Sequence, residues 1–162
     1  MNIDNAGNKI RDIAAMTTSA NRFAIIVVVS TALLALLAYF LGRTFFTGIV
    51  HVVELVQAVL VCSTALMGLS GLMIIEIKKA NVTGLSSDDM FEKVKAINTI
   101  TSLARAHVFL RWALSLSIVS IIFSVLLLMI NDPAFIVGAL AAFLAQIYLF
   151  IWGLMFSDFL PS

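Results

Sequence analysis

KKANVTGLSSDDMFEKVKAINTITSLARAHVFLR, residues 78–111, is the stretch of sequence that decides the fold of this chain. It is largely polar and carries six Lys and Arg residues against three Asp and Glu residues, and it lies between two pairs of long apolar runs. The four runs are Phe23–Leu41, Val50–Ile77, Val108–Ile130 and Ala134–Phe156. Each run is near or above the ~20 residues that cross a hydrocarbon core of ~30 Å as a helix. Because backbone polar groups inside a bilayer must be satisfied within helices, the sequence predicts an all-α bundle of four transmembrane helices.

The composition leads to the same class independently. Of the 162 residues, 62% are apolar and 12% are charged, and the mean hydropathy is +1.10. Soluble domains have roughly 45–50% apolar and about 25% charged residues, so water is not the main solvent of this chain. We expect a single membrane domain over 1–162. Its parts are an N-terminal amphipathic segment (1–22), a first hairpin (23–77), a cytoplasmic amphipathic segment (78–107) and a second hairpin (108–162).

The positive charges predict which ends of the runs face the cytoplasm. Nine of the ten Lys and Arg residues fall before the first run, between the second and third, or, for Arg111, at the beginning of the third; only Arg43 falls on the other side. By the positive-inside rule both termini are cytoplasmic, and the chain crosses the membrane as two in-out-in hairpins. This arrangement is typical of a bacterial inner-membrane protein.

The second half of the chain partly repeats the first. At an offset of 84 residues the segment from Asn8 matches the segment from Glu92 without a gap, with identities at Lys9/Lys93, Ile13/Ile97, Thr17/Thr101 and Ala20/Ala104. A tandem duplication explains the match, and so does convergence of two amphipathic helices that both enter a membrane. Both explanations stay open.

The basic segments predict amphipathic helices. In the second segment, apolar residues follow helical spacing from Met90 to Val108, and no Pro or Gly separates them from the third span. This predicts one helix of about 40 residues, ~60 Å long. If it stands upright, its apolar stripe needs a protein partner; if it bends near Arg105–Arg111, the stripe lies on lipid headgroups. The cations expected to contact lipid or a partner are Lys9, Arg11, Lys93, Lys95 and Arg105.

Four polar side chains in or near the spans form a candidate site. His51, Glu54 and Gln57 follow at three-residue spacing near the outer end of the second span, and Gln146 lies in the fourth span. One interpretation is a proton or cation site, because ionisable residues inside a membrane are costly and are often functional. The other is an interfacial polar cluster together with one interhelical amide.

Stripes of small residues on three spans predict close helix packing, either within the bundle or between chains. They are Ala58, Cys62, Ala65, Gly68 and Gly71 in the second span, Ala113, Ser117, Ser120 and Ser124 in the third, and Ala134, Gly138, Ala142 and Ala145 in the fourth.

No motif in the sequence predicts catalysis, a metal site or a cofactor. There is no Ser-His-Asp set, metal-ligand spacing, Gly-rich phosphate loop or nucleic-acid-binding patch. The two histidines, His51 and His107, belong to opposite ends of their spans, so they cannot ligate one haem iron. We therefore expect a non-enzymatic protein whose partners are membrane lipids together with other membrane protein subunits, copies of itself, or both.

The short basic start, the four spans, the polar segment 78–106 and the approach to the third span at Lys93–Arg111 form one overall pattern. In this pattern the chain resembles the small polytopic inner-membrane transfer proteins of IncI-type conjugative plasmids and their Dot/Icm counterparts in type IVB secretion. The resemblance implies a structural role in a DNA- or protein-transfer apparatus or its pilus. Two alternatives stay open: a small oligomeric proton, cation or solute channel, and an accessory subunit of an energy-transducing membrane complex.

Overall fold

A computed structural model of the chain describes residues 3–42, 52–79, 90–130 and 134–157. These residues form four helices and no strand: α1 (Ile3–Gly42), α2 (Val52–Lys79), α3 (Met90–Ile130) and α4 (Ala134–Ser157). The predicted all-α class is confirmed. Each helix is long and apolar enough to cross a membrane, which is consistent with a multi-pass integral membrane protein.

Two of the helices are much longer than a bilayer requires. α1 has 40 residues and joins the N-terminal amphipathic segment to the first apolar run. α3 has 41 residues and is continuous from Met90 to Ile130, as the unbroken pattern predicts, without the bend considered near Arg105–Arg111. The physical reason is that both prolines of the chain, Pro133 and Pro161, lie outside the helices, so no missing N–H interrupts either one.

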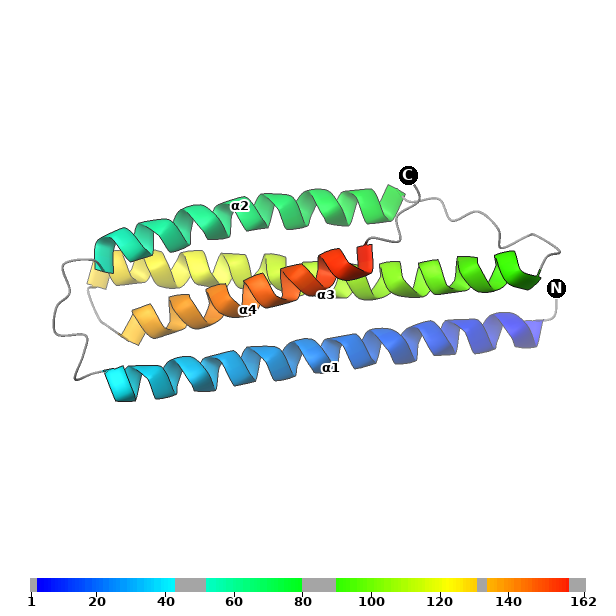
Figure 1. Ribbon diagram of the computed structural model, residues 1–162, viewed down its shortest axis with the longest axis horizontal. Coiled ribbons are helices and arrows are strands. Elements are labelled where there is room, and N and C mark those ends of the chain that lie inside the picture. Colours follow the sequence, from blue (N-terminus) through cyan, green and yellow to red (C-terminus); the bar gives the residue numbers. More distant parts are fainter. Residues whose placement is uncertain (1–2, 43–51, 80–89, 131–133, 158–162) are drawn as a thin grey trace.

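The four helices alternate in direction along one long axis (Figure 1). α3 is the central helix: it packs most extensively on α4, and it also contacts α2 and α1. α1 lies against α4 and α3 on one side, and α2 lies against α3 and α4 on the other. Within the described ranges α1 and α2 do not contact each other, so the first pair is not a packed hairpin.

The ends of the helices are uneven. At the end of the bundle where α1 begins, α1 and α3 extend beyond the last turn of α4 (Figure 1). The apolar core therefore lies where three helices overlap. Its buried members are Ala20, Ala24 and Val27 of α1, Phe109, Ala113 and Leu116 of α3, and Ala145 and Leu149 of α4.

The packing is not repeated between the two halves. An offset of 84 residues relates α1 to α3 and α2 to α4 in sequence. The helices of the second half, α3 and α4, form the most extensive contact of the bundle, whereas those of the first half, α1 and α2, have no contact among the described residues. The tandem duplication stays a prediction.

Candidate functional site

A polar contact joins three helices inside the bundle. The hydroxyl of Ser63 on α2 donates to the hydroxyl of Ser120 on α3 at 3.1 Å, and Ser120 donates to the carbonyl of Ala139 on α4 at 3.2 Å. The amide nitrogen of Gln146 on α4 lies 3.5 Å from the carbonyl of Ser63, a long hydrogen bond. Ser63, Ser120 and Gln146 are completely buried, so Gln146 forms an interhelical amide contact.

Three further buried polar atoms have no hydrogen-bond partner among the described residues. They are the hydroxyls of Ser70 and Ser124 and the side-chain carbonyl of Gln146, Oε1. A buried polar group without a hydrogen bond is destabilising by roughly 1–3 kcal/mol in proteins. The buried polar groups are thus uncharged serine and glutamine side chains, and they lie in an interior that is otherwise mainly apolar.

The predicted polar site is not assembled as one cluster. Glu54 and Gln57 are exposed near the beginning of α2, and His51 lies outside the described residues. Gln146 contacts α2 at Ser63, which is nine residues, or ~14 Å along the helix, from Glu54. The structure therefore does not bring Gln146 together with Glu54 and Gln57.

The small-residue stripe of α2 faces away from the other helices. Ala58, Cys62, Ala65 and Gly68 are exposed, and Gly71 is half-buried. The interior face of α2 is instead made by Val56, Val59, Ser63 and Ser70. Ser63 and Ser70 are not among the packing residues predicted for this helix, although their seven-residue separation on an apolar helix is itself a signal for one buried face.

The stripes of α3 and α4 lie mainly in the interior. Ala113, Ser117, Ser120 and Ser124 are all fully buried in α3. In α4, Ala142 and Ala145 are buried, Gly138 is half-buried and Ala134 is exposed. A Cβ built on Gly138 would come within 3.0 Å of the Phe123 ring, so this glycine allows a close approach to α3.

Cationic and aromatic residues of all four helices gather at one level of the bundle. Arg105 of α3 lies over the ring of Phe156 on α4, 5.7 Å from its centroid, and the same ring stacks on Phe109 and Trp152. Arg22 of α1 adjoins Phe23, whose ring meets Phe109 edge-on. Burial, and then the positive charges of Lys78 on α2 and Arg111, lower the pKa of His107 on α3. This basic level has the composition of a membrane–water interface, where aromatic and cationic side chains concentrate.

The helix lengths agree with that assignment. Nineteen residues separate Arg111 from Ile130 at the end of α3, or ~29 Å, about one hydrocarbon thickness. Of the other predicted contact residues, Arg11 and Lys95 are exposed on the far side of this level. Lys9 and Lys93 belong to α1 and α3, and their side chains are outside the described part of the structure.

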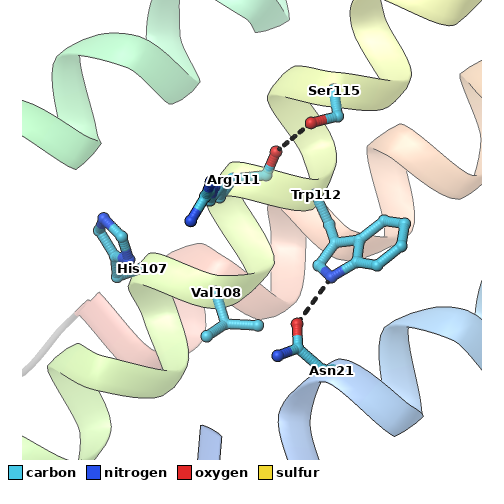
Figure 2. A pocket seen from close by; sticks show the side chains of 6 residues that line it. All are labelled: Asn21, His107, Val108, Arg111, Trp112 and Ser115. Atoms are coloured by element: carbon cyan, nitrogen blue, oxygen red, sulfur yellow. Dashed lines mark hydrogen bonds between the residues drawn. The ribbon is translucent and has the colours of Figure 1, made fainter. Parts of the chain in front are cut away.

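A cavity of about 290 Å³ opens at the basic level between α1 and α3. It is lined by Asn21 of α1 and by His107, Val108, Arg111, Trp112 and Ser115 of α3 (Figure 2). The indole N–H of Trp112 donates to the Asn21 side-chain carbonyl at 2.9 Å and ties the two helices together. Sequence reasoning could not find this cavity, because it depends on which residues of α1 and α3 come to lie side by side.

Neither comparison with known proteins nor a metal-binding group in the described part of the chain assigns a function to it. No protein-family model, curated protein or solved structure matches the chain. Among the described residues no group of three or more His, Cys, Asp or Glu side chains is arranged to hold a metal ion.

Proposed function

We propose that this chain is a non-catalytic integral membrane subunit of a larger protein assembly. The observation that carries the proposal is the exposed apolar surface on the part of α3 that extends beyond the basic level. Met90 is 80% exposed, Val94 49% and Ile97 37%. Met90 lies 21 residues before Arg111, ~31 Å along a continuous helix, so these side chains stand well outside the hydrocarbon core of the bilayer.

This geometry favours a protein partner over lipid. An amphipathic helix that rests on a membrane has to turn into the membrane plane, whereas α3 passes through Arg105–Arg111 without a break. Exposed apolar side chains outside the bilayer then need a surface of another protein, or of a second copy, to cover them.

The orientation of the chain in the membrane and the identity of the host assembly belong to the same proposal. The concentration of Arg and Lys at the basic level supports cytoplasmic termini and a bacterial inner membrane, with two in-out-in pairs of spans. The resemblance to IncI-type transfer proteins and Dot/Icm components supports a conjugative or type IV secretion apparatus, or its pilus, as the host assembly. An accessory subunit of an energy-transducing complex would use the same surfaces, and the partners that co-purify separate the two.

The test is site-specific photo-crosslinking in the native membrane. A photoreactive residue at position 90 is expected to give discrete adducts with one or a few proteins. Position 129 is a matched control, because Met129 is the same residue type on the same helix, is 78% exposed, and lies at the opposite end. If position 90 gives no protein adduct, or gives the same diffuse lipid and protein adducts as position 129, the proposal is wrong.

The buried polar groups favour the channel as the second candidate. Gln146 Oε1, Ser70 and Ser124 provide buried hydrogen-bonding atoms along the bundle. Gln146→Leu is expected to abolish flux of protons, cations or a neutral solute into liposomes if this interior conducts. Unchanged flux in Gln146→Leu and in Glu54→Gln would exclude a path through either residue.

A further inference from the structure

Several side chains that line the cavity between α1 and α3 carry hydrogen-bond donors. Arg111 contributes a guanidinium with five N–H donors, and His107 contributes an imidazole (Figure 2). Among the described residues that line the cavity there is no carboxylate.

The hydrogen bond from Trp112 determines how the side-chain amide of Asn21 is oriented. Because the indole nitrogen can only donate, the Asn21 side chain must present its oxygen to Trp112. Its amide nitrogen then points away from Trp112, toward the side of Val108 (Figure 2). Asn21 therefore adds N–H donors to the cavity.

The surrounding charge is also positive. Burial, followed by the positive charges of Lys78 on α2 and Arg111 on α3, lowers the pKa of His107, so the charge comes from Lys78 and Arg111 while the imidazole stays neutral. A cavity with cationic and N–H donor groups favours an anion, and the fork of an arginine suits phosphate oxygens in particular.

An apolar stripe leads away from the cavity along α3. Arg111 and Ser115 are followed on the same helix face by Ile118, Ile122 and Val125, at spacings of three and four residues. All three apolar side chains are exposed. From Ser115 to Val125 the stripe extends ~15 Å, which is half of a ~30 Å hydrocarbon core and thus one leaflet.

We propose that this cavity binds the phosphate of an anionic phospholipid in the leaflet at the basic level, with one acyl chain along Ile118, Ile122 and Val125. A volume of about 290 Å³ is small for a ligand pocket, so it takes a headgroup while the chains remain outside. A free phosphate ion offers the same oxygen chemistry to Arg111 and Asn21, but it leaves the apolar stripe unused.

The test is native mass spectrometry of the full chain in detergent, titrated with phosphatidylglycerol. Arg111→Gln is expected to weaken binding roughly tenfold, because it removes a charge-assisted phosphate contact. Arg22→Gln is the matched control: it removes the same charge from an exposed position at the same level that does not line the cavity, and binding should change less than about twofold. Trp112→Phe should also weaken binding, because Asn21 is no longer held in place.

Three results would overturn the proposal. Equal weakening in Arg111→Gln and Arg22→Gln would mean that lipid responds only to overall charge. Equal affinity for zwitterionic phosphatidylcholine would exclude an anionic headgroup site. Displacement of the lipid by millimolar inorganic phosphate would make a free anion, and not a lipid, the occupant.

Discussion

Gly153 of α4 packs directly against the side chain of Leu110 on α3. A Cβ built on this glycine would lie 2.7 Å from Cγ of Leu110 and 2.8 Å from its Cδ2. Leu110 is completely buried, so its side chain has little room to move. The contact fixes how closely α3 and α4 approach at the basic level, where the aromatic rings of Phe109, Trp152 and Phe156 also meet.

Gly153→Ala is therefore expected to destabilise the bundle. Overpacking of a buried contact typically costs about 1–3 kcal/mol, which outweighs the gain of up to ~1 kcal/mol from replacing a helical glycine with alanine. The measurement is the thermal or denaturant unfolding of the protein in detergent. Gly68→Ala is the matched control, because a Cβ at Gly68 meets nothing within 4 Å, and this variant should be neutral or slightly more stable. Equal stability of the two variants would contradict the close contact.

Ser120→Ala should loosen the contact of α2, α3 and α4. The substitution removes the hydrogen bond from Ser63 and the one to the Ala139 carbonyl. Interhelical hydrogen bonds in membrane bundles average about 0.6 kcal/mol, so the expected loss of unfolding free energy is about 1 kcal/mol. Thr64→Ala is the control, since its exposed hydroxyl bonds only within α2, to Leu60. A loss at position 64 as large as that at position 120 would argue against the interhelical contact.

The bond between Trp112 and Asn21 is expected to contribute a measurable coupling between α1 and α3. A double-mutant cycle of Trp112→Phe and Asn21→Ala should give a coupling free energy of about 0.5–1.5 kcal/mol, because the contact is partly exposed and neutral. Unfolding monitored in detergent supplies the four free energies. Strict additivity of the two substitutions would mean that the bond does not form.

The orientation in the membrane can be tested with introduced cysteines, because Cys62 is the single native cysteine. In a Cys62→Ala background, Arg11→Cys and Lys95→Cys should resist a membrane-impermeant maleimide added outside intact cells and react after lysis. Arg43→Cys is expected to react in intact cells. The opposite pattern would reverse the orientation drawn from the positive-inside rule.

The existence and extent of the helices follow from the sequence because hydropathy and the positions of proline determine them. The unbroken run from Met90 to Ile130 is an example: nothing in it removes a backbone donor, and one helix results. The neighbours of each helix do not follow in the same way. In lipid, an apolar face is equally suited to acyl chains and to another helix, so hydropathy did not indicate that α1 and α2 lie apart.

The same reasoning explains which site residues can be predicted from the sequence and which cannot. Gln146 was identified as an interhelical amide candidate because a lone polar side chain in an apolar helix needs a partner. The exposed stripe around Ala65 was not distinguishable from a buried one, because small residues suit both a lipid-facing surface and a contact between chains. The cavity at Asn21 and Arg111 combines residues 90 positions apart, and only their packing brings them together.

Because the described helices α1 and α2 do not contact each other, the bundle can pack only after α3 and α4 have been synthesised. A chain is made from its N-terminus, so α1 and α2 enter the bilayer before the helices on which they pack have been translated. Until α3 and α4 arrive, each is an isolated helix in lipid with its packing surface uncovered. The packing of the first two helices thus depends on the half of the chain that is synthesised last, and a chain released after Lys79 would have two helices without a contact between them instead of a half-built bundle.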